Sequence, residues 1–485
     1  MSIRSFCVST SVCAFACLCI SPVAQADWLR FRGPNGSGIS ADSAATSTKW
    51  SSKEGVKWKA ELPGAGVSSP VIVGDRVFVT CYSGYGLDRQ DPGTLEDLKR
   101  HVVCLSRLDG KVQWTKTIEA VQPEDPFAGM GVPAHGYASH TPVSDGENLY
   151  VFMGKSGVLA FDFEGKELWR TSVGTESDPK RWGSASSPIL HENLVIVVAS
   201  AESRSVVGLD KKTGKEVWKQ ETDGVTDVWG TPLLVETEGR TDLVLGVPYE
   251  FWGLNPETGK LRWYSEAMDS DSYNSSVVEA DGVIYGIEGR GGGSAAVKAG
   301  GKGDTTEKNT IWTGNDSARF GSPLVVNGHI YYFSNGVATC IKASDGEEVF
   351  KGRLPGGTAA RGGDGGRPQG RPGGDGNRPP EGRADAGGRG GFGGGFGGRG
   401  GGFGGRGGGG GGFGSMDYAS PVSADGKIYY VKSDGTTHVI NASDEFELLA
   451  SNKVTEDKET FAATPAISNG QVFLRSDKHL YCIGE

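Results

Sequence analysis

Residues 208–218 read Gly-Leu-Asp-Lys-Lys-Thr-Gly-Lys-Glu-Val-Trp, and much of the chain repeats this pattern. The pattern predicts the end of one β-strand, a tight turn and a second strand that carries Trp218. Asp210 can accept hydrogen bonds from the turn amides, and Gly214 can adopt a positive φ without a Cβ clash. Related stretches end at Trp114, Trp169 and Trp263. The chain is therefore a repeat protein.

Eight repeats begin with an apolar strand, and a Ser/Thr-Pro step marks seven of these starts, while Ser275-Ser276 stands in the remaining one. The prolines of these steps are Pro70, Pro142, Pro188, Pro232, Pro323, Pro421 and Pro465. The starts are about 45 residues apart where no insert intervenes, which is the period of a four-stranded propeller blade. The last repeat stops before its fourth strand, and residues 56–62 match a fourth strand that has no others before it.

These observations predict an all-β protein, an eight-bladed β-propeller of four-stranded antiparallel blades. The N-terminal strand is expected to complete the last blade and close the ring, which removes an open sheet edge. We expect a leader at residues 27–54, blades 1–6 with the closing strand at 55–356, and blades 7–8 at 415–485.

Residues 1–26 have the features of a signal peptide. Arg4 is followed by an apolar stretch and by the small-residue site Ala24-Gln25-Ala26. The stretch Phe15-Ala16-Cys17 leaves open whether the exported protein is lipidated or soluble. No later apolar run is long enough to span a membrane, so the mature chain is expected to have no transmembrane helix.

Residues 357–414 form a Gly-, Arg- and Phe-rich insert that cannot bury a core, so we predict disorder. Its Phe-Gly-Gly-Arg-Gly-Gly pattern resembles RNA-binding Arg-Gly-Gly segments. We interpret it instead as a flexible tether, because the protein is expected to be exported. The whole chain carries a formal charge of −10 although the signal and the insert are basic. The acidic propeller should repel nucleic acid and attract basic proteins.

The cysteines outside the signal peptide are expected to have a packing role and not a metal-binding or redox role. Three of them share one strand position with small residues of the other repeats: Cys104, Cys340 and Cys482 alternate with Ala160, Gly208 and Gly253. A free buried cysteine behaves as a small hydrophobic residue. Cys81 lies on another strand, which leaves open a disulfide with Cys104.

An aromatic residue precedes most proline steps by three or four positions, at the end of each blade that borders the central channel. The candidate ligand-binding residues at the channel mouth are Tyr137, His140, Trp182, Trp229, Tyr273, Asn274, Phe320, Tyr418 and Phe461. Such a ring could stack on a flat ligand or grip a peptide. Alternatively, it is a hydrophobic plug that packs the blade tops together.

His140 occupies a position that small residues fill in the other blades. It is the candidate catalytic group, since an imidazole there could transfer a proton or bind a ligand. Alternatively, it only hydrogen-bonds the long loop that precedes it. The spacing between His135 and His140 is weak support for a metal, and we expect none.

The repeated pattern resembles the tryptophan-docking repeat of pyrroloquinoline quinone (PQQ) quinoproteins. It is closest in type to their non-enzymatic relatives, the BamB-like outer-membrane assembly lipoproteins. The resemblance covers residues 55–485 apart from the insert. It implies that each docking tryptophan packs against the neighbouring blade; these residues are Trp58, Trp114, Trp169, Trp218, Trp263 and Trp312.

The chain lacks the vicinal cysteine pair of alcohol-oxidising quinoproteins, a Cys-x-x-Cys-His haem motif and a recognisable calcium ligand set. We therefore expect an exported propeller, periplasmic, envelope-associated or secreted, that binds or scaffolds a protein or a small ligand at the channel mouth. We expect a monomer without a cofactor whose partner is another exported or envelope protein, and the acidic charge favours a basic one. The alternative is a quinoprotein oxidoreductase of alcohols or sugars that uses PQQ and calcium.

Overall fold

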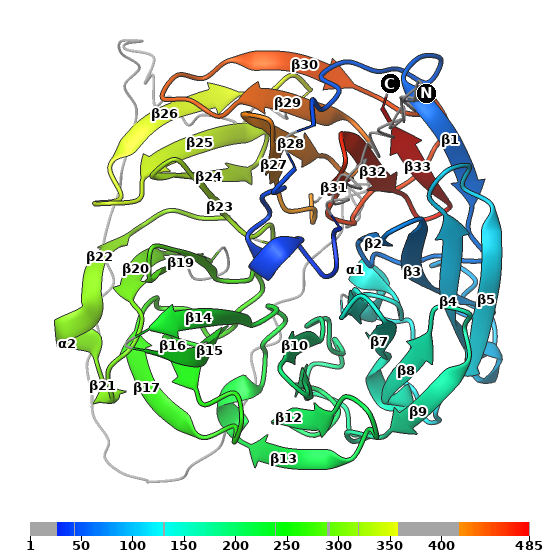
Figure 1. Ribbon diagram of the computed structural model, residues 1–485, viewed down its shortest axis with the longest axis horizontal. Coiled ribbons are helices and arrows are strands. Elements are labelled where there is room, and N and C mark those ends of the chain that lie inside the picture. The colour runs from blue at the N-terminus through cyan, green and yellow to red at the C-terminus, as the bar shows by residue number, and fades with distance from the viewer. Residues whose placement is uncertain are drawn as a thin grey trace, which may run out of the picture. The chain divides into compact units, whose positions relative to one another are not determined.

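The computed structural model describes residues 27–42, 44–129, 131–237, 239–288, 292–318, 320–356 and 417–484. The expected signal peptide and the Gly-rich insert lie outside these residues and stay predictions. The described residues form eight antiparallel sheets that follow one another around a ring (Figure 1). The strands are short because each repeat of about 45 residues contains four strands and the turns that connect them.

The first four blades take their strands in chain order. Blade 1 contains β2 (Val71–Val73), β3 (Arg76–Ser83), β4 (Lys99–Ser106) and β5 (Val112–Glu119); blade 2 contains β6 (Val143–Ser144), β7 (Asn148–Phe152), β8 (Val158–Asp162) and β9 (Glu167–Thr171). Blade 3 contains β10 (Ile189–His191), β11 (Leu194–Ala199), β12 (Ser205–Asp210) and β13 (Glu216–Glu221); blade 4 contains β14 (Leu233–Thr237), β15 (Arg240–Val247), β16 (Glu250–Leu254) and β17 (Leu261–Glu266). A short strand, β21 (Gly303–Asp304), joins blade 4 in parallel beside β17.

The next blades follow the same plan. Blade 5 contains β18 (Val278–Ala280), β19 (Val283–Ile287), β20 (Ser294–Lys298) and β22 (Thr310–Gly314); blade 6 contains β23 (Leu324–Val326), β24 (His329–Ser334), β25 (Val337–Lys342) and β26 (Glu348–Arg353). Blade 7 contains β27 (Val422–Ala424), β28 (Lys427–Val431), β29 (Thr437–Asn441) and β30 (Leu448–Asn452). The helical turns are η1 (Pro34–Gly36), η2 (Leu95–Asp97), α1 (Val132–His135), η3 (Gly154–Ser156), η4 (Asp223–Val225) and α2 (Thr306–Asn309).

Blade 8 combines the two ends of the described chain. It contains β31 (Ala466–Ser468), β32 (Gln471–Arg475) and β33 (His479–Ile483), and its fourth strand is β1 (Val56–Glu61). β1 pairs antiparallel with β33, and Trp58 lies opposite Cys482. Figure 1 shows β1 and β33 side by side at the rim. The predicted eight-bladed propeller and its closure by the N-terminal strand are confirmed.

The small residues of the third strands lie opposite the docking tryptophans. Gly208 pairs with Trp218, and Cys104 pairs with Trp114. A Cβ atom on Gly208 would lie 2.4 Å from the Trp218 ring, so a large side chain cannot share this position. The four described cysteines are free, and Cys81 pairs across the sheet with His101. The disulfide that the sequence left open is therefore absent.

Five docking tryptophans bind the next blade in one way. Their Nε1 groups donate to backbone carbonyls at 2.8–3.1 Å: Trp58 to Arg107, Trp114 to Phe163, Trp169 to Lys211, Trp218 to Pro256 and Trp312 to Ala343. The ring also covers the turn glycine of that blade. Gly214 has a φ of 69°, and a Cβ there would lie 2.5 Å from the Trp169 ring. The turn glycine thus serves both backbone geometry and packing.

Trp263 differs from the other five. It is fully buried, but its Nε1 donates to Asp242 of its own blade at 2.7 Å. Asp242 also pairs with Arg240 and Arg262 and has no exposed surface. The segment of blade 5 that would present a turn glycine instead forms β21, which pairs beside Trp263. The buried carboxylate takes the place of the neighbouring carbonyl.

The leader lies across the ring and contacts blades on different sides of it. Trp28 pairs with Ile72 of blade 1, and Ile39 pairs with Ser423 of blade 7. Between them, η1 lies near the centre of the ring (Figure 1). Residues on either side of η1 reach blades on different sides, so the leader belongs to the hub of the molecule.

Candidate functional site

A cavity of about 170 Å³ occupies the channel at the centre of the ring. Phe31 of the leader lines it at one end, and aromatic side chains of blades 3, 4, 6 and 7 line it elsewhere. Those side chains are Trp182, Trp229, Phe320 and Tyr418. The remaining described residues of its lining are neutral, apart from the titratable His135 of α1.

Eight hydroxyl side chains, one from each blade, also line this cavity; we call them the hydroxyl belt. They are Ser69, Thr141, Ser187, Thr231, Ser276, Ser322, Ser420 and Thr464. Each one precedes the first strand of its blade, at the serine or threonine of the Ser/Thr-Pro step or its equivalent. The repeat therefore places the same polar group at the channel eight times.

The hydroxyl belt is held by hydrogen bonds that run from blade to blade. Around the ring, the backbone N–H of one belt residue donates to the hydroxyl oxygen of the next at 2.9–3.0 Å, from Ser69 to Thr464. The final step from Thr464 to Ser69 lacks this bond, and Ser69 Oγ is buried without a partner. In these bonds the hydroxyl oxygens accept, so their protons stay free to donate.

The mouth aromatics form two pairs. Trp182 and Trp229 have centroids 5.5 Å apart, and Phe320 and Tyr418 have centroids 4.5 Å apart. Trp229 Nε1 donates to the Gly183 carbonyl at 2.8 Å, which fixes one pair across blades 3 and 4. Both pairs are tilted, and such pairs can present apolar ring surface to a ligand.

Asn274 of blade 5 lines the cavity between the two aromatic pairs. Its Nδ2 donates to Glu288 Oε1 at 2.8 Å and its backbone N–H to Oε2 at 2.9 Å. The buried Glu288 carboxylate therefore holds the Asn274 amide in a fixed orientation at the cavity wall.

Four of the residues expected at the mouth lie away from this cavity. Tyr137 packs against Tyr82 and donates to the Asp125 carbonyl, because the long loop of blade 1 folds over it. Tyr273 and Phe461 are almost fully buried between blades. His140 faces a second pocket. For Tyr273 and Phe461 the packing interpretation describes the geometry better than a ligand ring.

The second pocket is polar and has a volume of about 40 Å³. Arg100 pairs with Glu124 at 2.8 Å, and both side chains are buried. Lys155 donates to Ser177 at 2.8 Å and lies 3.7 Å from Asp125. The pocket has room for a few water molecules and not for an organic ligand.

His140 belongs to a buried relay in this pocket. Ser184 donates to Glu202 Oε1 at 2.5 Å, so His140 Nε2 donates to Ser184 Oγ at 3.1 Å. Burial lowers the pKa of His140 to about 3, helped by His135 and Arg100. Burial raises the pKa of Glu202 to about 7. His140 is therefore neutral near pH 7 and is a weak base.

His135 separates the two pockets and lines both. Its Nε2 donates to the Trp182 carbonyl at 2.6 Å, and Ser139 donates to its Nδ1 at 2.6 Å. With both nitrogens engaged, its role in this geometry is to fix Trp182 at the cavity wall.

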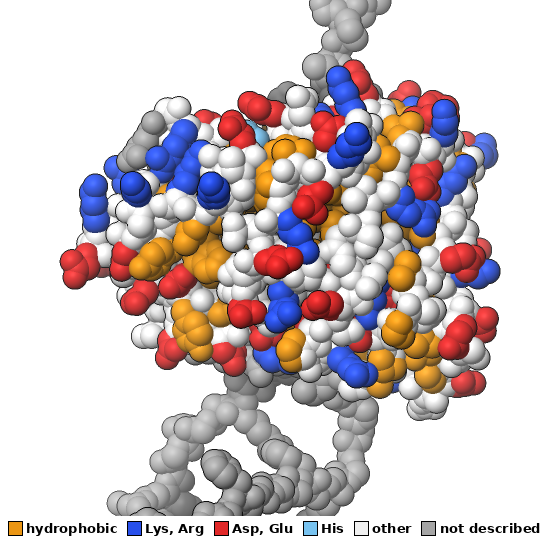
Figure 2. Space-filling view, turned by 90° about the horizontal axis from the view of Figure 1, so that it is seen from below, with side chains coloured by type: hydrophobic (Ala, Val, Ile, Leu, Met, Phe, Trp, Pro, Cys, Tyr) orange, Lys and Arg blue, Asp and Glu red, His pale blue; other side chains and the backbone are white. Residues whose placement is uncertain are grey.

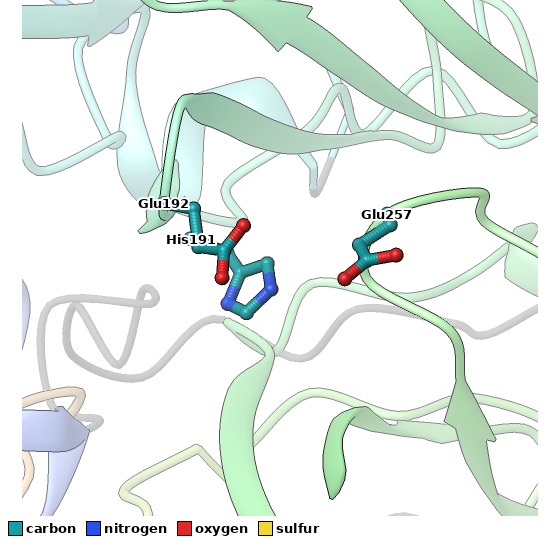
Figure 3. Close-up of side chains that lie close together, drawn as sticks. All are labelled: His191, Glu192 and Glu257. Atoms are coloured by element: carbon teal, nitrogen blue, oxygen red, sulfur yellow. The ribbon is translucent and has the colours of Figure 1, made fainter.

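One group of side chains could approach a metal ion. The ligand atoms of His191 at the end of β10, Glu192 after it and Glu257 in the turn between β16 and β17 lie within 4.8 Å of one another (Figure 3). Both glutamates are exposed. The group lies apart from the channel cavity, whose lining does not include it.

The outer surface is mixed in charge. Figure 2 shows acidic and basic side chains interspersed over one side, with hydrophobic groups between them. Several exposed aliphatic side chains lie on the outer strands, including Val112, Leu168, Val217, Leu261 and Ile311. Within the described chain no helix has the length and apolar character needed to cross a membrane.

Comparison with known proteins places this geometry in a family. A family model described as outer membrane protein assembly factor BamB matches residues 98–352, more than half of the chain. The chain belongs to this BamB family. The crystal structure of BamB from Moraxella catarrhalis has a TM-score of 0.52 at 12% identity and covers 88% of this chain and 98% of its own. That structure shares the fold.

Two further similarities concern a designed protein and an enzyme. The computationally designed Ika8 protein has a TM-score of 0.51 at 10% identity, over 89% of this chain and 99% of its own. A polyvinylalcohol dehydrogenase of a Pseudomonas species is 22% identical over 262 residues, which is 45% of this chain. The match spans 37% of that enzyme, so the chain corresponds to well under half of its length.

The cavity does not fit the cofactor of the quinoproteins. Calcium takes carboxylate, carbonyl and water oxygens, and the described lining residues of the cavity include no Asp or Glu. PQQ is a fused tricyclic quinone with three carboxylates, whereas a cavity of about 150 Å³ holds one benzene ring. Among the residues that the structure describes, no Lys or Arg side chain lines this cavity to pair with those carboxylates.

Two parts of the site were not predicted from the sequence. The first is the hydroxyl belt, although its residues are the Ser or Thr of the Ser/Thr-Pro steps. The recurrence of a hydroxyl residue at this position in every repeat is the signal that could have identified it. The leader stretch from Arg30 to Arg32 gave no such signal, because it occurs once and its contacts are with distant blades.

Proposed function

We propose that this protein is a binding module of the BamB family whose ligand site is the channel cavity. The observation that carries the proposal is a cavity whose described lining has no Asp, Glu, Lys or Arg and combines Phe31 of the leader, two aromatic pairs and the hydroxyl belt. Such a lining suits recognition, because it combines apolar contact with a few fixed polar groups. Proton transfer has little support there, since His135 has both nitrogens engaged.

The family description supports a setting in the cell envelope. We infer that the protein is exported and acts beside another exported or envelope protein, as an assembly factor would. The acidic propeller favours a basic partner surface. The mouth, where a cavity opens between Trp182 and Tyr418, is the face on which we place that contact.

A second candidate is a PQQ- and calcium-dependent oxidoreductase. The similarity to polyvinylalcohol dehydrogenase favours it, although that match covers only part of both chains. The lining chemistry argues against it, because the described part of the lining offers calcium no carboxylate.

One experiment separates the two candidates. The purified protein is incubated with PQQ and millimolar calcium, passed through gel filtration and assayed with an artificial electron acceptor and a panel of alcohols and sugars. We expect neither cofactor retention nor dye reduction. In parallel, small ring compounds are screened by ligand-observed NMR with the wild type and Trp182→Ala. Binding that Trp182→Ala abolishes supports the module, and stoichiometric PQQ retention with turnover establishes the oxidoreductase.

A further inference from the structure

Two turns that face each other across the junction of blades 3 and 4 bring three metal-binding side chains together. His191 is the last residue of β10, Glu192 follows it in the turn to β11, and Glu257 lies in the turn between β16 and β17. Their ligand atoms lie within 4.8 Å of one another, and the Glu257 carboxylate is turned toward the other two side chains (Figure 3). The cluster therefore combines one imidazole with two carboxylates from adjacent blades.

The corresponding turns at three other junctions set a basic side chain against an acidic one. In each case a residue in or directly after the turn between the first two strands of one blade meets a residue in the turn between the last two strands of the next blade. The pairs, with nitrogen–oxygen distances of 3.0–3.4 Å, are Arg76 with Glu164, Asp145 with Lys211 and His329 with Asp444. The repeat thus brings these two turns together and leaves the choice of side chains to each junction.

The blade 3–4 junction departs from this pattern, because its turns carry two carboxylates. Within the part of the chain that the structure describes, the side chains of His191, Glu192 and Glu257 form no ion pair and no hydrogen bond. Two negative charges at this separation repel each other, and a cation between them replaces repulsion with attraction. This junction therefore lacks the basic group that its counterparts take from the protein.

The backbone on both sides of the cluster is held by the fold. His191 pairs with Leu194 across the β10–β11 hairpin. On the other side, Trp218 Nε1 donates to the Pro256 carbonyl at 3.1 Å, directly before Glu257 in the chain. A metal ion would therefore meet ligands whose backbones are already placed, and binding would restrict only three side chains.

We propose that His191, Glu192 and Glu257 bind a zinc ion that joins blades 3 and 4. An imidazole with two carboxylates suits first-row divalent metals such as zinc, whereas calcium and magnesium prefer oxygen ligands alone. Ligand atoms around a tetrahedral zinc ion are about 3–4 Å apart, so small rotations of the two exposed glutamates complete the approach. The inference is independent of the proposed function, because these residues do not line the channel cavity.

This site differs from the expectation that the chain binds no metal. His191 and Glu192 belong to one repeat and Glu257 to the next, and no short spacing links them in the sequence. Only the packing of one blade against the next brings them together.

The test measures zinc binding to the full exported chain after treatment with EDTA and dialysis. Isothermal titration calorimetry at pH 7 should show one zinc ion per chain, and calcium should bind at least tenfold more weakly. Because the ligands meet only in the folded ring, the melting temperature should rise with zinc concentration. At about pH 5.5 the zinc affinity should fall, since protons compete for the imidazole.

Substitutions locate the ion. His191→Ala and Glu257→Gln should each weaken zinc binding at least tenfold and remove the rise in melting temperature. The matched controls are His329→Ala and Glu164→Gln, which change the same residue types at the corresponding turns of other junctions. Both controls should bind zinc as the wild type does.

Two results would overturn the inference. A wild type that binds no zinc at submillimolar concentration refutes the site and requires no variant that could misfold. Unchanged zinc affinity in folded His191→Ala and Glu257→Gln proteins assigns the ion to another place on the chain. Neither result bears on the channel cavity, where ring compounds whose binding depends on Trp182 would still support the proposed function.

Discussion

The junction between blades 8 and 1 differs from the junction between blades 3 and 4. Both contain a docking tryptophan whose Nε1 reaches a carbonyl of the next blade, Trp58 in the first and Trp218 in the second. The blade 3–4 junction also has its belt bond, from Ser187 to Thr231. The blade 8–1 junction lacks the belt bond, and Ser69 Oγ has no partner.

Two buried arginines cross the blade 8–1 junction in opposite directions. Arg475 of blade 8 donates to the carbonyls of Ser68 and Thr80 in blade 1, at 2.8 and 2.6 Å. Arg107 of blade 1 donates to the Ser468 carbonyl and to Gln471 of blade 8, at 2.7 and 2.8 Å. This difference shows that the contacts encoded by the repeat do not by themselves stabilise the junction where the ring closes. Side chains that occur once provide the additional contacts there.

Removing the closing strand should have the largest effect. Deletion of residues 27–62 removes β1, exposes the edge of β33 and discards Trp28 and Trp58 from the core. We expect loss of the folded monomer and aggregation through the open edge. Size-exclusion chromatography and circular dichroism measure this outcome. A monomer with unchanged melting would show that the blade 8–1 junction does not depend on β1.

The docking tryptophans should contribute similarly at both junctions. Trp58→Ala and Trp218→Ala should each lower the free energy of unfolding by ~3–5 kcal/mol, because each leaves a cavity between blades. Urea denaturation followed by fluorescence measures the change. A much smaller loss for Trp58→Ala than for Trp218→Ala would mean that the closing junction relies mainly on its arginines.

Arg475 should matter more than an arginine on the perimeter. Arg475→Met keeps much of the side-chain volume but leaves the carbonyls of Ser68 and Thr80 without this donor. We expect the free energy of unfolding to fall by about 2–3 kcal/mol. Arg170→Met is the control and should change it by less than about 0.5 kcal/mol, since Arg170 only pairs with Glu167 at the surface. Equal effects in the same urea assay would contradict a special role for Arg475.

The hydroxyl belt gives the smallest and most specific contrast. Ser187→Ala removes the acceptor of the buried Thr141 N–H, whereas Ser69→Ala removes a hydroxyl that accepts no bond. Ser187→Ala should therefore cost about 1–2 kcal/mol more in unfolding free energy. Thermal melts of the two variants side by side provide the measurement. Identical melting temperatures would contradict the prediction that the Ser187 hydroxyl stabilises the protein through a bond that Ser69 lacks.

The repeat made most of the fold predictable. Trp218 and Gly214 recur at fixed spacing, and a recurring pattern reports a recurring contact, so blade number and ring closure followed from local sequence. Trp263 looked the same in sequence, but its partner depends on a segment of blade 5 that folds into β21. That interaction is made across about 40 residues and has no local signal.

The candidate site was less predictable for the same reason. Trp182, Trp229, Phe320 and Tyr418 were expected at the channel mouth, and they line the cavity. Tyr137 shares their position in the repeat, yet the long loop of blade 1 covers it. The path of a loop is not encoded in the repeat. The contacts of Arg32 with a blade almost 300 residues away could not be read from sequence.

The contacts of the leader also affect the order in which the fold can form during synthesis. Its residues and β1 precede every blade in the chain, yet their partners include Ser423 of blade 7 and the last strand, β33. These contacts cannot form until the C-terminal blades have been synthesised. These two contacts therefore form after most of the chain has been made, and contacts of such high sequence separation are slow to form. A nascent chain halted before blade 8 would lack β31 to β33, and β1 would have no strand to pair with.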